Sequence, residues 1–122
     1  MRVAAMVAAG LCLSGAANAQ AITEKQINVI ENIAQVRVGK EFCPTVEINE
    51  AFVRGALAIY KINLDESPYK EEMARRMERI RSTINRGKGS HAAKSKIVCA
   101  NLQELFGPNG KRVRNLVKAS AT

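Results

Sequence analysis

The first stretch with a helical pattern of hydrophobic residues follows a Thr-x-x-Gln capping box at Thr23–Gln26 and runs to Gly39. Its hydrophobic residues recur at helical spacing: Ile27, Ile30, Ile33 and Ala34. Three valines in the same stretch also suit a β-strand: Val29, Val36 and Val38. We therefore predict a helix that ends at Gly39, with a strand as the alternative.

A second helix is predicted after Asn49, whose side chain suits an N-cap, and Cys43-Pro44 leads into it. Its hydrophobic residues share one stripe: Phe52, Val53, Ala56, Leu57 and Tyr60.

A third helix is predicted between Ser67 and Gly87, with Ser67 as N-cap, Pro68 in the first helical position and Gly87 as a left-handed C-terminal cap. Its hydrophobic residues again share one face: Tyr69, Met73, Met77, Ile80 and Ile84.

A fourth helix is predicted over about residues 92–106, with Cys99 inside it and a hydrophobic face made by Ile97, Val98, Leu102 and Leu105. Gly107-Pro108-Asn109-Gly110 is a strong turn signal, and Val113, Leu116 and Val117 predict a short last helix. No run alternates long enough to require a sheet. The expected fold is all-α, a small bundle of four to five short helices.

The N-terminus has the three parts of a secretory signal peptide. Arg2 supplies the charge, Val3 to Leu13 form the apolar run, and Ala17-Asn18-Ala19 offers a cleavage site after Ala19. A membrane anchor or a lipoprotein is less favoured, because the apolar run is short and Leu11 precedes Cys12 where lipidation requires a small residue. We expect residues 1–19 to be a signal peptide, residues 20–122 to form a single domain, and the chain to be periplasmic or secreted.

Removal of the signal peptide leaves Cys43 and Cys99 as the only cysteines. In a small exported domain, a structural disulfide between them is favoured over a free thiol or an intermolecular bridge. Such a bond would tie the start of the second predicted helix to the fourth.

Positive charge is concentrated in the second half of the chain. The net charge is +8, and loss of Arg2 with the signal peptide leaves +7. Residues 20–69 hold 5 basic and 7 acidic side chains, whereas residues 70–122 hold 13 basic and 4 acidic ones. This asymmetry bears on anionic partners and on solubility, and it carries no information about the fold.

The third predicted helix carries a basic face opposite its hydrophobic stripe. Its arginines project within about 40° of one another: Arg75, Arg79 and Arg86. Three lysines extend the basic character beyond the helix: Lys88, Lys94 and Lys96. Glu71 and Glu72 lie four residues before Arg75 and Arg76 and are expected to neutralise part of the charge.

Three interpretations of the basic face stay open: a solvated surface, a nucleic-acid site, or a surface for an anionic lipid, polysaccharide or protein outside the cytoplasm. Nucleic acid is the least favoured partner, because residues 70–105 contain no Phe, Tyr or Trp side chain that would stack on bases. The segment Gly87-Lys88-Gly89-Ser90 lacks the glycine spacing of a P-loop and is interpreted as an exposed basic loop.

Catalytic and metal-binding side chains are few. His91 is the only histidine, and together with Cys43 and Cys99 it supplies too few ligands for a tetrahedral zinc site. No acid, base and nucleophile form a recognisable constellation. We therefore expect no enzyme activity, no metal and no cofactor.

Met73 and Met77 are expected to pack in the core, with an adaptable binding surface as the alternative. In size, signal and two cysteines, the chain is similar to the acid-stress chaperones of the bacterial periplasm. It departs from them in its positive charge and in the segment Phe42-Cys43-Pro44-Thr45. Three hypotheses follow: a non-enzymatic protein that binds an anionic partner through the basic face, a stress chaperone or envelope-maintenance factor, and a secreted effector that acts on a host.

Overall fold

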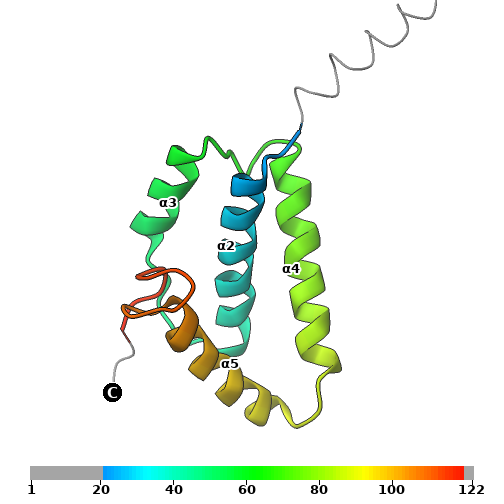
Figure 1. Ribbon diagram of the computed structural model, residues 1–122. Coiled ribbons are helices and arrows are strands. Elements are labelled where there is room, and N and C mark those ends of the chain that lie inside the picture. The colour runs from blue at the N-terminus through cyan, green and yellow to red at the C-terminus, as the bar shows by residue number, and fades with distance from the viewer. Residues whose placement is uncertain (1–20, 120–122) are drawn as a thin grey trace, which may run out of the picture.

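The computed structural model describes residues 21–119, so the predicted signal peptide lies outside the described residues. Four helices follow one another along this part of the chain: α2 (Glu24–Phe42), α3 (Glu50–Ile59), α4 (Tyr69–Arg86) and α5 (His91–Phe106). Figure 1 shows α2 in the middle, α3 and α4 on either side of it, and α5 across the lower end. Within residues 21–119 there is no strand, and the only β-type pairing is an isolated antiparallel bridge between Ile48 and Val117. The all-α prediction is confirmed.

The central helix α2 begins as the sequence predicts. The Thr23 side chain accepts a hydrogen bond from the Gln26 backbone, and the Gln26 side chain accepts one from the Thr23 backbone. The valines that also suited a strand are helical, and Val36 and Val38 are fully buried in the core. Because α2 contacts α3, α4 and α5, it needs hydrophobic side chains on several of its faces and not on one stripe alone.

The prediction that this helix ends at Gly39 is wrong, because α2 continues to Phe42 and Cys43 is its C-cap. Gly39 instead allows a close approach between α2 and α5. A Cβ atom at this position would lie 2.7 Å from Cδ2 of Leu102, which is buried in the core. The glycine is thus a packing position inside a helix, and the helix ends one turn later.

Alanine at Gly39 is expected to lower the free energy of unfolding by about 1 kcal/mol, because overpacking against Leu102 outweighs the gain in helix propensity. Gly55 provides the matched control, since a Cβ there would meet nothing within 4 Å. Gly55→Ala is expected to raise the same free energy by up to about 1 kcal/mol. Urea unfolding of the two variants measures both values, and changes of the same sign would contradict the packing role of Gly39.

Helix α3 begins after Asn49, whose side chain accepts a hydrogen bond from the Phe52 backbone, as predicted. Val53 is the only residue of this helix that is fully buried. Phe52 and Tyr60, placed in the hydrophobic stripe by the sequence, remain 38% exposed. Only part of the predicted stripe therefore contributes to the core.

Helix α4 differs from the prediction at both ends. It begins at Tyr69 with Pro68 in the cap position, and the Ser67 hydroxyl donates to the Glu71 carboxylate instead of accepting from the helix backbone. Gly87 ends the helix in an extended conformation, with φ −67° and ψ 160°, so it is not the predicted left-handed cap. The positive φ in this loop occurs at Gly89, which allows the turn into α5.

The hydrophobic face of α4 packs on α2. Met73 belongs to the buried core, and Met77 and Ile80 pack against it. The prediction that the two methionines are core residues is confirmed.

The short last helix predicted around Val113 and Leu116 does not form, so the described chain has four helices. Backbone amides of the C-terminal segment donate instead to the last carbonyls of α5: Lys111 to Glu104, Arg112 to Leu105 and Val117 to Phe106. These carbonyls have no partner inside a helix, and the C-terminal segment satisfies them. Leu116 and Val117 are nonetheless buried, which accounts for their hydrophobic spacing.

Candidate anion-binding surface

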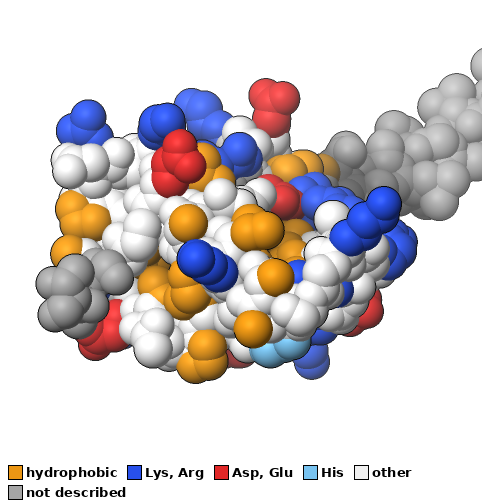
Figure 2. Space-filling view, turned by 90° about the horizontal axis from the view of Figure 1, so that it is seen from below, with side chains coloured by type: hydrophobic (Ala, Val, Ile, Leu, Met, Phe, Trp, Pro, Cys, Tyr) orange, Lys and Arg blue, Asp and Glu red, His pale blue; other side chains and the backbone are white. Residues whose placement is uncertain are grey.

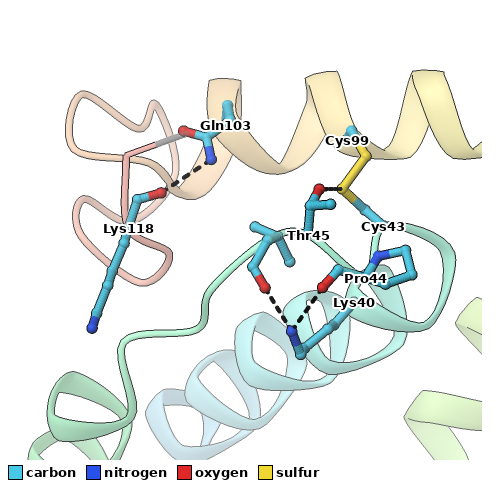
Figure 3. The surroundings of a disulfide bond; sticks show 8 residues. Lys40, Cys43, Pro44, Thr45, Cys99, Gln103 and Lys118 are labelled. Carbon is cyan, nitrogen blue, oxygen red and sulfur yellow. Dashed lines mark hydrogen bonds between the residues drawn. A yellow bond between two sulfur atoms is a disulfide. The ribbon is translucent and has the colours of Figure 1, made fainter. Parts of the chain in front are cut away.

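The predicted disulfide is present: Cys43 at the end of α2 is bonded to Cys99 in the middle of α5, with a Cα–Cα distance of 5.4 Å. Figure 3 shows the loop that follows Cys43 folded back over the end of α2. The Lys40 ammonium group holds this loop by donating to the backbone oxygens of Pro44, at 3.1 Å, and Val46, at 2.7 Å. Two of the predicted site residues are therefore confirmed as a structural bond.

The six predicted anion-binding side chains separate into two groups. Arg75 and Arg79, in the first part of α4, form ion pairs with carboxylates of the protein itself. The other four lie at or after the end of α4: Arg86, Lys88, Lys94 and Lys96. Arg75, Arg79 and Arg86 all lie in α4, as predicted. The two groups differ in that only the first forms ion pairs with carboxylates of the described residues.

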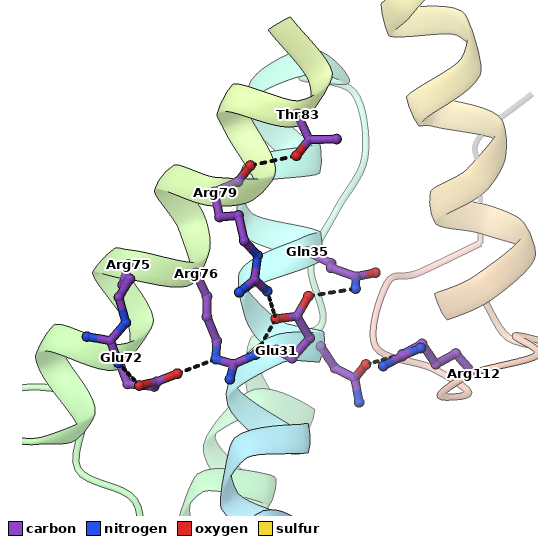
Figure 4. A network of polar contacts seen from close by, with 9 residues as sticks. Glu31, Gln35, Glu72, Arg75, Arg76, Arg79, Thr83 and Arg112 are labelled. Atoms are coloured by element: carbon purple, nitrogen blue, oxygen red, sulfur yellow. Dashed lines mark hydrogen bonds and ion pairs between the residues drawn. The ribbon is translucent and has the colours of Figure 1, made fainter. Parts of the chain in front are cut away.

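Arg75 and Arg79 belong to a network of ion pairs that also connects α4 to α2 (Figure 4). Arg75 pairs with Glu72, which also accepts from Arg76 at 2.5 Å. Arg76 and Arg79 both reach across to Glu31 of α2, with N–O distances of 2.7 and 2.9 Å. The predicted pairing of Arg76 with Glu72 is confirmed, whereas Arg75 pairs with Glu72 and not with Glu71.

Glu31 lies at the centre of this network. Burial opposes its ionisation, but hydrogen bonds from Gln35 and Arg76 and the positive charges of Arg79 and Arg76 outweigh burial and lower the pKa of Glu31 below 4.5. Because Glu31 is shared by Arg76 and Arg79, its carboxylate offsets only part of the charge of Arg79, whose side chain is 59% exposed.

A second ion pair connects α4 to α2 near the end of both helices. Nε and Nη2 of Arg81 each donate to a different oxygen of Glu41, both at 2.7 Å, in the bidentate geometry that guanidinium favours. The hydrogen bond from Arg81 lowers the pKa of Glu41, burial acts in the opposite direction, and the positive charge of Arg81 lowers it further. The sequence offers no signal for this pair, because its partners are 40 positions apart.

Arg86, Lys88, Lys94 and Lys96 surround the turn between α4 and α5, and this group is called the turn cluster below. Among residues 21–119, no carboxylate forms an ion pair with any of the four. Lys94 donates to the Asn85 backbone oxygen at 2.9 Å, which joins the start of α5 to the end of α4. The turn cluster is thus the part of the predicted basic face that forms no ion pair within the described residues.

A large hydrophobic side chain lies beside the turn cluster: Ile97, on the outer face of α5, is 61% exposed. Figure 2 views the molecule from the α5 end and shows hydrophobic side chains in the middle of this face, with most Lys and Arg side chains along its edges. The surface therefore combines cationic groups with exposed apolar area.

His91 is the first residue of α5 and is exposed, with its ring centroid 5.7 Å from that of Phe42. Between residues 21 and 119, no group of three or more His, Cys, Asp and Glu side chains is arranged to hold a metal ion. His91 therefore contacts the Phe42 ring where α2 ends and α5 begins.

Comparisons with protein families, curated proteins and solved structures found no match to this chain. In the part of the chain that the structure describes, no helix combines the length and apolar character needed to cross a bilayer.

Proposed function

We propose that this chain is an exported, non-enzymatic protein that binds the anionic lipid surface of a membrane through the turn cluster. The observation that carries the proposal is the presence of four cationic side chains around one turn with no carboxylate in ion pairs with them among the described residues. Export is supported by the N-terminal sequence and by the disulfide between Cys43 and Cys99.

Lipid is favoured over a polysaccharide because apolar side chains adjoin the cations. Ile97 is exposed on α5 between the directions of Lys94 and Lys96. An interfacial surface of this kind gains both from electrostatic attraction to head groups and from burial of apolar area.

The structure favours this function over a chaperone that works through its methionines. Met73 is 6% exposed and Met77 packs against the core. Met73 is therefore closed to a client in the folded protein, and Met77 exposes only part of its side chain.

Binding to vesicles tests the proposal. Phosphatidylglycerol vesicles are expected to bind the protein at low salt, phosphatidylcholine vesicles are not, and added salt should weaken binding steeply. Reversing three charges of the turn cluster, Arg86→Glu, Lys88→Glu and Lys96→Glu, is expected to weaken binding at least tenfold, because each basic residue near the surface contributes about 1 kcal/mol.

The control reverses three exposed cations elsewhere, Arg54→Glu, Lys61→Glu and Lys70→Glu, which changes the net charge by the same amount. This variant is expected to keep most of the binding. Equal losses in both variants would mean that net charge alone attracts the protein and would refute a specific surface. Binding to an acidic polysaccharide but not to the vesicles would contradict lipid as the partner.

A further inference from the structure

A cavity of about 350 Å³ lies between α2, α3 and the C-terminal segment, away from the turn cluster. Its apolar lining comes from all three parts of the chain: Val29, Ile33, Phe52, Ala56, Tyr60 and Leu116. This volume falls in the range of pockets that bind small molecules.

Hydrogen bonds at both ends of α3 hold this helix beside the cavity, and Val53 fixes its middle to the core. At one end, the Gln26 side chain of α2 donates to the Tyr60 backbone oxygen at 2.8 Å. At the other, the Asn49 backbone amide donates to Leu116 at 2.9 Å, and its side chain donates to the Asn115 backbone oxygen at 3.1 Å. Figure 1 shows α3 inclined to α2, with the C-terminal segment crossing near the start of α3. The cavity lies beside the face of α3 that carries Phe52, Ala56 and Tyr60.

The apolar surface of the cavity has a buried base and partly exposed walls. Ile33 and Leu116, at its base, are 2% exposed. The rings of Phe52 and Tyr60, in the walls, are 38% exposed. Aromatic rings left accessible next to buried aliphatic side chains suit a ligand with an apolar body.

The polar groups of the cavity are concentrated on one edge, along α2. Lys25, Asn28 and Asn32 line this edge, and the Asn32 side-chain oxygen accepts a hydrogen bond from Arg112 at 2.5 Å. No Asp or Glu lines the cavity. The edge thus presents a cation and amide groups, which together complement an anionic head group.

We propose that this cavity binds a single-chain anionic amphiphile of the fatty-acid type. Its carboxylate lies at the edge formed by Lys25 and Asn28, and its hydrocarbon chain lies against Ile33, Phe52 and Leu116. The site is separate from the turn cluster, so the proposal stands independently of membrane binding.

A titration followed by NMR tests the proposal, with decanoate as the probe and decanol as its neutral counterpart. Decanoate is expected to shift the methyl signals of Ile33 and Leu116 and the ring signals of Phe52 and Tyr60. Lys25→Gln is expected to weaken decanoate binding about tenfold and to leave decanol binding unchanged, because only the carboxylate interacts with the ammonium group. Lys70→Gln, an exposed cation outside the cavity, should change neither affinity.

A second variant fills the cavity. Ala56→Phe is expected to abolish binding of both probes, whereas Ala51→Phe, at an exposed position of the same helix outside the cavity, should not affect binding. Absence of shifts at the cavity residues at millimolar decanoate would overturn the proposal. Equal binding of decanoate by the wild type and Lys25→Gln would overturn the assignment of the anionic head. Shifts confined to Arg86, Lys88 and Lys96 would also overturn it, while leaving the membrane-binding proposal intact.

Discussion

Replacing both Cys43 and Cys99 with alanine is expected to lower the free energy of unfolding by about 4 kcal/mol. The bond joins residues 56 positions apart, and the chain-entropy estimate for a closed loop of that size is about 4 kcal/mol. Small domains typically have a total stability of about 5–15 kcal/mol, so the loss would remove a large fraction of it. Urea unfolding of the wild type and the double variant measures this difference.

The disulfide also anchors the less buried half of α5 to the rest of the fold. Leu102 and Phe106 of α5 are buried in the core, but its first half, up to Val98, contains no fully buried residue. Cys99 lies at the boundary between these halves and fixes α5 to the end of α2.

Reduction of the wild-type protein provides the control for the alanine substitutions. Cys43 is buried, so alanine there also removes apolar contacts, whereas a reducing agent breaks only the bond. Reduced wild type is expected to unfold at a urea concentration close to that of the double variant and slightly higher, because it keeps the contacts of the Cys43 side chain. If reduction left the midpoint unchanged, the stabilising role of the bond would be wrong.

Helix positions could be predicted from the sequence because local signals determine them. The capping residues Thr23 and Asn49 act on backbone amides within three positions, and both act as predicted. Helix ends were less predictable where tertiary packing decides. Glycine is common at helix ends, so Gly39 was predicted to end the helix. The glycine is instead required by the close approach of Leu102, which belongs to a helix far away in the sequence.

The C-terminal segment shows the same limit. Val113, Leu116 and Val117 have helical spacing, but the amides of Val113 and Val117 donate to the Leu105 and Phe106 carbonyls at the end of α5. Burial and not helix formation explains their hydrophobic character, since Leu116 and Val117 pack in the core. Periodicity alone does not separate these two causes in so short a stretch.

The residues of the basic surface could be predicted from the sequence, but their ion pairs with α2 could not. Angular positions on one helix placed Arg75, Arg79 and Arg86 together, and they do share a face of α4. That face also borders α2, where Arg79 shares the Glu31 carboxylate with Arg76. A pairing over 48 positions depends on how two helices pack, which no local pattern specifies.

Replacing Glu31 with alanine is expected to lower the free energy of unfolding by about 2 kcal/mol. The side chains of Glu31 and Arg76 are only 15% and 17% exposed, so removing the carboxylate leaves Arg76 poorly solvated. Glu72 still pairs with Arg76, which keeps the loss below the full value for breaking a buried pair. Glu78→Ala is the matched control, because Glu78 is 72% exposed and Arg81 retains Glu41; its expected cost is about 0.5 kcal/mol or less.

The same carboxylate gives the stability a defined pH dependence. The pKa of Glu31 is lowered in the folded protein, so the folded state favours its ionised form more than the unfolded state does. Its contribution is therefore fully present above the unfolded value of 4.5 and is lost as pH falls through the lower folded pKa. Glu41 acts in the same direction through Arg81.

Urea unfolding of wild type and Glu31→Gln across this pH range measures the effect. Glutamine keeps the shape of the side chain but does not titrate, so the wild type should be more stable at neutral pH and the two curves should converge on acidification. A difference in stability that stayed constant down to about pH 2 would show that the charge of Glu31 does not stabilise the α2–α4 interface. Convergence would instead identify the Glu31 ion pairs as the contacts between α2 and α4 that acid weakens.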